Sequence, residues 1–133
     1  MQTLEMISAL SNACGPSGFE DDALRAVRQF APAGYALAGD ALNNLYLRRE
    51  KADGAKPVLQ LDAHSDEVGF MVQAVRPNGT LRFIALGGWV NSNIPAHRVR
   101  VRTRFGTWIP GVVAAKPPHF MSEAEKGRTP EIE

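Results

Sequence analysis

Residues 58–72 read VLQLDAHSDEVGFMV and are the most informative part of the chain. Its apolar residues Val58, Leu59 and Leu61 predict a strand over 58–64, which leads into a polar end over 62–67. Side chains two positions apart on a strand point the same way and lie roughly 6.5 Å apart. We therefore expect His64 and Asp66 to face one space at the carboxyl end of the strand, where ligands bind in open α/β sheets.

A histidine with a carboxylate two residues further on fits a metal site. A neutral imidazole suits Zn, Co or Mn, and the carboxylate can fix the orientation of the ring or act as a further ligand. The plain alternative is a hydrogen-bonded polar cluster in a loop, which so short a motif does not exclude. By strand alternation, Asp62 shares the face of His64 as a hydrogen-bond acceptor, whereas Glu67 points to the other face.

The segments around this stretch predict an α/β fold. Apolar residues at helical spacing predict one helix over residues 4–13 and another that ends before Pro32. Ser17 and Glu20 have the spacing of a capping box for the second helix. Pro77-Asn78-Gly79 is a hairpin turn signal. Strands are expected at 44–48, 68–75, 80–86, 99–103 and 108–114, and a loop from 116 onward.

Length and composition favour a globular chain in the cytoplasm. The 133 residues fit one ordinary domain, and 44% apolar and 22% charged residues exclude a disordered tail, a collagen-like repeat and a coiled coil. With a net charge of +1, the chain has no strong overall charge that would attract nucleic acid or a membrane surface. Cys14 is the single cysteine, so a reducing compartment is expected. We read no secretory signal and no apolar run long enough to cross a bilayer.

Four arginines alternate along one predicted strand. Arg98, Arg100, Arg102 and Arg104 would share a face, and such a basic stripe can bind a nucleic-acid backbone. Aromatic residues beside the stripe are few, mainly Phe105 and Trp108. An isolated run of charge is usually a solvated or subunit-facing surface, so we expect no nucleic-acid partner.

A set of motifs, in order, resembles the glutamyl aminopeptidase family of co-catalytic metallopeptidases. This family includes the tetrahedral aminopeptidases and proteins labelled cellulase M or endoglucanase. The resemblance runs from about Leu4 to Glu125. It is carried by Gly15-Pro16-Ser17-Gly18-Phe19-Glu20, by Asp40 with Asn44-Leu45, by 61–72, by Leu86-Gly87-Gly88-Trp89, by Pro95-Ala96 with Arg98-Val99, by Gly111-Val112-Val113 and by Lys116-Pro117-Pro118-His119.

The resemblance implies a mixed-sheet catalytic domain interrupted by a small β-rich dimerisation domain. Residues 1–67 would be the N-terminal part of the catalytic domain, and 68–133 the first part of the inserted domain. His64 matches the family's first metal ligand. Asp66 matches the catalytic carboxylate that supports the metal site. Asn43 stands where the family often has glycine, a mild change because asparagine tolerates positive φ.

The implied activity is that of a metal-dependent aminopeptidase that removes N-terminal residues from short peptides. Two divalent metals, Zn or Co with Mn as a further option, would activate the attacking water. The resemblance also implies a homo-oligomer, either a dimer or a larger shell. The general base and the remaining ligands match nothing in these 133 residues, so we expect the chain alone to be inactive and to bind metal weakly.

Two other classes of function stay open. The cellulase label of the family prompts a glycosidase, which needs paired carboxylates across a sugar-binding cleft. A truncated, non-catalytic assembly module is the alternative outside enzymes.

Overall fold

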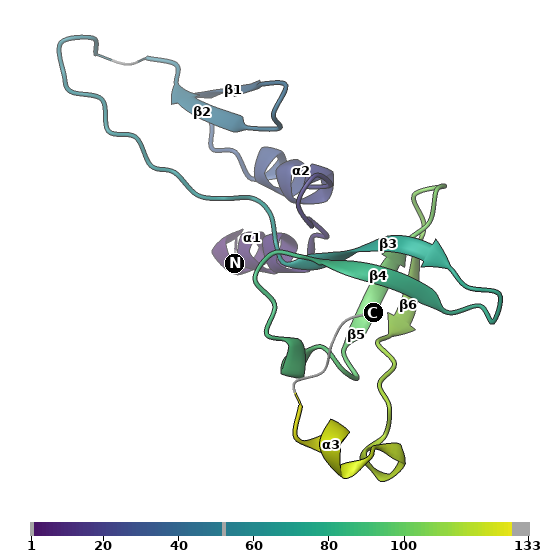
Figure 1. The fold of residues 1–133 in the computed structure, drawn as a ribbon. Coiled ribbons are helices and arrows are strands. Elements are labelled where there is room, and N and C mark those ends of the chain that lie inside the picture. The colour runs from purple at the N-terminus through teal and green to yellow at the C-terminus, as the bar shows by residue number, and fades with distance from the viewer. Residues whose placement is uncertain (1, 52, 129–133) are drawn as a thin grey trace. The chain divides into compact units, whose positions relative to one another are not determined.

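The computed structural model describes residues 2–51 and 53–128. The chain divides into two compact units, Met1–Gly69 and Phe70–Glu133. Along the described residues, two helices are followed by three two-stranded sheets and a last short helix (Figure 1), which confirms the predicted mixture of helices and strands. Within the described part of the chain, no helix is both long enough and apolar enough to cross a membrane.

The first unit begins with two helices that pack on each other. Helix α1 spans Gln2–Asn12 and helix α2 spans Asp21–Gln29, which confirms both predicted helices. Cys14 and Ala26 are buried in this unit. The predicted capping box is wrong, because Glu20 is the N-cap of α2 and no side chain caps that end. The hydroxyl of the expected cap, Ser17, is bonded elsewhere.

An antiparallel hairpin follows, built from β1 (Tyr35–Gly39) and β2 (Leu45–Arg49). The sequence predicts β2 but not β1, whose small residues carry a weak strand signal. Asp40 organises the turn between them. Its carboxylate accepts hydrogen bonds from the Leu42 and Asn44 backbone N–H groups, both at 2.9 Å, from the Asn44 amide at 2.8 Å and from the Tyr46 hydroxyl at 3.0 Å.

The turn also contains Asn43, whose φ is 62°. Asparagine enters this left-handed region more readily than most other non-glycine residues. The positive φ that an asparagine tolerates is thus present at Asn43.

The predicted strand over 58–64 is wrong. Residues 57–66 run extended without forming a ladder with any described residue. Their apolar side chains are therefore uncovered: Val58 is 94% exposed, Leu59 84% and Leu61 88%. The apolar run is present, but the neighbour that would turn it into a strand is not among the described residues.

The second unit is built on two hairpins. Strand β3 (Gly69–Val75), which starts at the end of the first unit, pairs with β4 (Leu81–Leu86), and β5 (Arg98–Arg102) pairs antiparallel with β6 (Trp108–Val112). These four strands confirm the prediction to within two residues at each end. Short 3-10 turns lie at Asn91–Asn93 and Pro118–Phe120.

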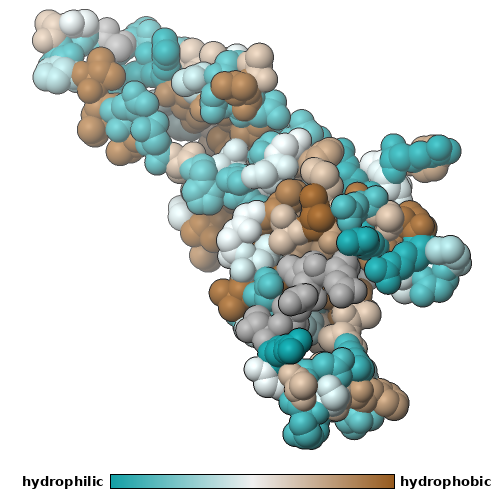
Figure 2. Space-filling view, in the orientation of Figure 1, coloured by the Kyte–Doolittle hydropathy of each residue, from teal (hydrophilic) through white to brown (hydrophobic). Residues whose placement is uncertain are grey.

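Aromatic rings pack at the centre of this unit. Phe70 lies 4.6 Å from Phe83 and stacks on Trp89 at 4.6 Å between ring centroids. Ile94 is 2% exposed and Val113 9%. On β5 the arginines lie on the exposed face, while the valines between them are half-buried. Many large apolar side chains nevertheless remain on the surface of the chain (Figure 2).

A short helix that the sequence did not predict lies near the end of the described chain. Helix α3 spans Glu123–Lys126, where the sequence predicted a loop. Ser122 caps it in a capping box with Glu125, and Lys116 Nζ lies 2.7 Å from Glu125 Oε1. One helical turn is too short to show a hydrophobic period, so only the capping pattern could have revealed it.

We expect the 133-residue chain to associate in solution because of its exposed apolar run. Unpaired extended backbone and uncovered Leu59 and Leu61 invite pairing with another chain. Light scattering should show dimers or larger species, and the double variant Leu59→Ser, Leu61→Ser should shift them toward monomer. Leu42→Ser is the control, since Leu42 is equally exposed at 84% but lies outside the run. A monodisperse wild-type monomer of 14.5 kDa with a cooperative melt would contradict this expectation.

The turn between β1 and β2 should weaken in acid. The Asn44 side-chain hydrogen bond, with those from the Asn44 backbone, Tyr46 and Leu42, lowers the pKa of Asp40 from 3.8 to about 2. Because the folded-state pKa is depressed, this stabilisation is complete above the ordinary pKa and is lost as pH falls toward 2. The melting temperature of wild type should exceed that of Asp40→Asn at pH 6, and the difference should vanish near pH 2. A pH-independent difference, or the same profile for Asp62→Asn, would refute this assignment.

Candidate functional site

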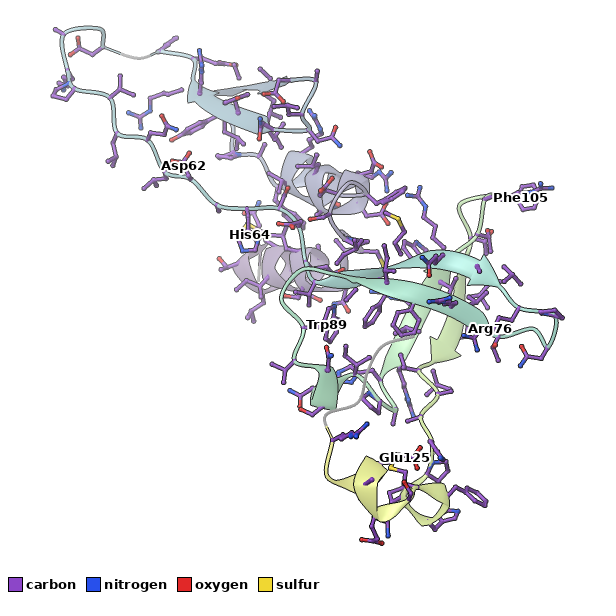
Figure 3. All side chains as sticks on the ribbon, viewed as in Figure 1. Asp62, His64, Arg76, Trp89, Phe105 and Glu125 are labelled. Carbon is purple, nitrogen blue, oxygen red and sulfur yellow. The ribbon has the colours of Figure 1, made fainter. Side chains whose placement is uncertain are left out.

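His64 and Asp66 lie against each other in the first unit. His64 Nδ1 is 3.0 Å from Asp66 Oδ1 and 2.9 Å from the Asp66 backbone oxygen. The backbone carbonyl oxygen can only accept a hydrogen bond, and so can the oxygen of an ionised carboxylate. The proton in both contacts must therefore sit on Nδ1. In the neutral ring the other nitrogen, Nε2, then keeps its lone pair. The His64 side chain is 85% exposed and projects from the extended run (Figure 3), so this nitrogen is open to a ligand.

Ser17 holds the other side of the Asp66 carboxylate. Its hydroxyl donates to Asp66 Oδ2 at 2.5 Å. The Ser17 hydroxyl, followed by the His64 ring, lowers the pKa of Asp66 below its usual value, because both donate to the charged form. Asp66 is therefore an anion at neutral pH and keeps its full ability to accept the Nδ1 proton of His64.

Two hydrogen bonds between Gly15 and Glu67 bring these residues together. Glu67 N–H donates to the Gly15 carbonyl at 2.8 Å, and Gly15 N–H donates to Glu67 Oε1 at 3.0 Å. An isolated parallel bridge joins Pro16 to Glu67 at the same place. The segment after α1 thus lies beside residues 66 and 67, which come about fifty positions later in the sequence. The Glu67 carboxylate binds Gly15 and not His64, as the alternation of side chains predicted.

Gly69 allows this close approach. A Cβ at position 69 would lie 2.7 Å from Pro16 Cβ, closer than real Cβ atoms come to one another. Any other residue would push the Pro16 turn away from the chain that carries Asp66. The glycine in the Val68-Gly69-Phe70 part of the motif therefore has a packing reason.

The contact between His64 and Asp66 was predicted from the sequence, but the contacts that hold these two residues in place were not. The pair lies in extended chain, and not at the end of a paired strand. Asp62 does not serve His64 as expected, since its Oδ1 accepts from the Gln60 amide at 2.9 Å. The contribution of Ser17 was missed, because its spacing to Glu20 indicated a cap. The one sequence feature that pointed to a role in the site was the place of Ser17 in the motif over 15–20 that resembles the family.

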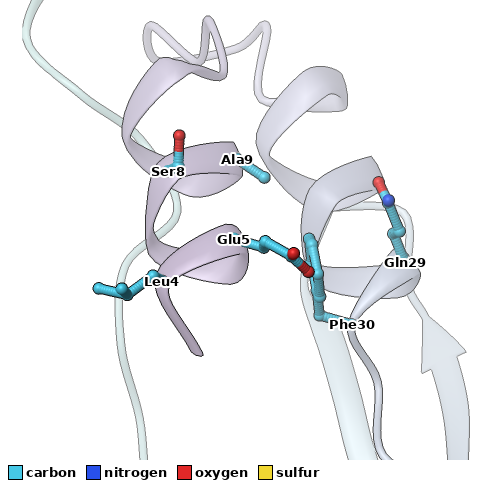
Figure 4. A pocket seen from close by; sticks show the side chains of 6 residues that line it. All are labelled: Leu4, Glu5, Ser8, Ala9, Gln29 and Phe30. Carbon is cyan, nitrogen blue, oxygen red and sulfur yellow. The ribbon is translucent and has the colours of Figure 1, made fainter. Parts of the chain in front are cut away.

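The other histidines and the cysteine make contacts of their own. In the second unit, the His97 ring meets Trp89 edge-on with 5.8 Å between ring centroids, and the His119 ring packs on Phe120 at 4.4 Å. Cys14 is buried at 7% exposure. A shallow hollow between α1 and α2 (Figure 4) contains neither His64 nor Asp66 in its lining of Leu4, Glu5, Ser8, Ala9, Gln29 and Phe30.

The His64–Asp66 pair fits one corner of a metal site. Histidines that ligate metals usually donate the second ring N–H to a carboxylate, which is the arrangement found here. Among residues 2–51 and 53–128, no three His, Cys, Asp or Glu side chains gather closely enough to hold an ion. Stable zinc sites use three or four protein ligands, so a complete site needs further donors.

Comparison with known proteins assigns the chain to a family. The sequence profile of the M42 glutamyl aminopeptidases matches residues 43–133. The glutamyl aminopeptidase of Lactococcus lactis subsp. cremoris (strain MG1363) is 33% identical over 135 residues, covering 99% of this chain and 37% of the relative. The chain belongs to the M42 glutamyl aminopeptidase family. Members of this family are enzymes, which the name of the Lactococcus protein reflects.

Solved structures agree with the M42 assignment. A TET aminopeptidase from the marine sediment archaeon Thaumarchaeota archaeon SCGC AB-539-E09 superimposes with a TM-score of 0.86 at 32% identity, covering 98% of this chain and 36% of its own. PhTET1-12s, with a dodecamer in the asymmetric unit, gives a TM-score of 0.70 at 25% identity, covering 90% of this chain and 35% of its own. The chain thus spans about a third of the length of the relatives it matches.

Replacing Gly69 should loosen the contact that holds the pair. In Gly69→Ala the new Cβ meets Pro16, and overpacking of this kind costs about 1–3 kcal/mol of unfolding free energy. Gly54→Ala is the matched control, because nothing lies within 4 Å of a Cβ at position 54. Denaturant unfolding of both variants checks this. Equal stability of Gly69→Ala and Gly54→Ala would show that the close approach to Pro16 is absent in solution.

Proposed function

We propose that this chain contributes the first metal-binding histidine of an M42 aminopeptidase that removes N-terminal residues from short peptides. The observation that carries the proposal is the state of the His64 ring. Nδ1 is engaged by Asp66, while Nε2 is exposed and free to bind a cation.

In this proposal each residue has one role. His64 binds a divalent metal through Nε2, and Asp66 fixes the tautomer and direction of the ring. Two such metals, Zn or Co with Mn as a further option, supply a water activated for attack on the first peptide bond. The remaining ligands and the general base come from outside these 133 residues. The chain alone is then inactive and binds metal weakly, since one histidine and one carboxylate leave most coordination positions to water.

The complete enzyme has the length of the relatives, of which this chain is about a third. Residues 1–67 supply the opening of the catalytic domain, and 68–133 the first part of an inserted dimerisation domain. The unit boundary after Gly69 supports this division. We propose a homo-oligomer, a dimer or a larger shell, which the dodecamer of PhTET1-12s supports. The single buried Cys14 fits the reducing cytoplasm.

The relatives' names favour a peptidase over the alternative glycosidase. The His64–Asp66 pair agrees with that preference, because a glycosidase requires two carboxyl groups facing each other across a sugar. Here the one carboxylate in the pair is occupied by Ser17 and His64.

The test compares two histidines in the full-length protein that carries these residues. His64→Ala should lower the release of N-terminal residues from short peptides by more than about 100-fold, since losing even an outer partner of a metal ligand costs 10–100-fold. His97→Ala is the control, because its ring packs edge-on against Trp89 within the second unit. Activity is measured with added Zn or Co. Equal effects of the two substitutions, or full activity of His64→Ala, would overturn the assignment of the histidine.

A further inference from the structure

We propose that Ser17 is a positioning residue that acts through Asp66 to hold the His64 ring in its metal-binding tautomer. This inference rests on the proposed function, in which Nε2 of His64 binds a metal. It gives the Ser17 hydroxyl a role other than the capping of helix α2 that its spacing to Glu20 predicted.

Both oxygens of the Asp66 carboxylate are engaged, and by different residues. Oδ2 accepts from Ser17 at 2.5 Å, and Oδ1 lies 3.0 Å from His64 Nδ1. The terminal torsion of an aspartate is soft, so a carboxylate held at one oxygen can turn about it. With 40% of the Asp66 side chain exposed, water would replace the lost partner and favour other orientations. The second bond, from Ser17, removes that freedom.

Ser17 is itself fixed by a short turn that is tied at several points. Phe19 N–H donates to the Pro16 carbonyl at 2.8 Å, and Gly18 takes a φ of 86°, which glycine adopts readily. The Gly18 N–H donates to Glu20 Oε1 at 2.6 Å. The bridge from Pro16 to Glu67 then anchors the turn beside Asp66.

The competing role for Ser17 is not used. The N-terminus of α2 has no side-chain cap, although Ser17 and Glu20 have capping-box spacing. Since a carboxylate cannot donate, the hydroxyl proton of Ser17 must point to Asp66. A hydrogen bond to a charged acceptor is roughly twice as strong as a neutral one, which explains why the hydroxyl goes to Asp66 and not to a backbone N–H.

The chain of contacts makes a specific chemical prediction. Asp66 in its fixed orientation accepts the Nδ1 proton, and this leaves the Nε2 lone pair for the cation. Without the Ser17 hydroxyl the carboxylate turns, and only the Asp66 backbone oxygen, 2.9 Å from Nδ1, still accepts that proton. The preference for the proton on Nδ1 then weakens, and a fraction of the rings carries the proton on Nε2. That fraction cannot bind metal until the proton moves.

The first measurement reads the ring directly, without metal and without activity. Long-range proton–nitrogen NMR spectra of the 15N-labelled 133-residue chain at pH 7.5 distinguish the two neutral tautomers. Wild type and Ser17→Thr, which keeps the hydroxyl, should show His64 protonated on Nδ1. Ser17→Ala should show a shift toward the Nε2-protonated form. Ser11→Ala is the control, since Ser11 is an exposed serine on α1 of the same unit.

The second measurement is calorimetric titration of the same variants with Zn. Ser17→Ala should weaken binding about 10-fold, the lower end of the range for outer partners of a metal ligand, because Ser17 acts through Asp66. Ser17→Thr should stay within about 2-fold of wild type, because it keeps the donor. Circular dichroism confirms folding. If Ser17→Ala fails to fold, Ser17→Cys replaces it, since a thiol is nearly the same size and only a weak donor.

The outcomes separate this inference from the proposed function. Unchanged ring nitrogens in Ser17→Ala overturn the role of Ser17, as does an effect that Ser17→Thr fails to rescue, because that would mean that the turn itself was damaged. Zn binding that His64→Ala does not weaken overturns the proposed function instead. The NMR spectra of the His64 ring still decide the role of Ser17 in that case, since they are recorded without metal.

Discussion

Two hydrogen bonds between Gly15 and Glu67 hold together the parts of the chain from which the candidate site is built. They place the turn after α1 beside a segment that is remote in sequence, so that Ser17 can reach Asp66. The contact is close enough to require a glycine at position 69, opposite Pro16. Without the contact between Gly15 and Glu67, His64 would lie on an exposed extended chain with one flexible carboxylate beside it. With this contact, the ring has a defined tautomer and an open nitrogen.

The parts of the fold that were predicted correctly are those set by local patterns. Both helices and the two hairpins of the second unit follow from apolar spacing and turn residues. The pattern S-x-x-E occurs twice, and only the copy at Ser122 forms a capping box. The copy at Ser17 fails because the Asp66 carboxylate, distant in sequence, competes for the hydroxyl. Sequence spacing alone cannot detect a competitor that the fold brings in.

In the candidate site, too, local spacing was predictive and contacts remote in sequence were not. His64 and Asp66 were found because they are two residues apart, within a motif that resembles the M42 family. Their support was not found, because it comes from the other end of the first unit. The strand expected over 58–64 failed for a related reason, since an apolar run becomes a strand only beside a partner. The chain spans about a third of its relatives' length, and the uncovered side chains of Leu59 and Leu61 agree with a partner outside these residues.

In the proposed arrangement, Asp66 and Ser17 turn His64 so that Nε2, and not Nδ1, binds a metal. A crystal structure of the full-length protein that carries these residues, grown with Zn, tests this most directly. The account predicts a Zn ion about 2.0–2.1 Å from His64 Nε2, with Nδ1 still bonded to Asp66 and Ser17 still bonded to its other oxygen. Zinc bound through Nδ1, or a zinc site that leaves His64 free, would contradict it.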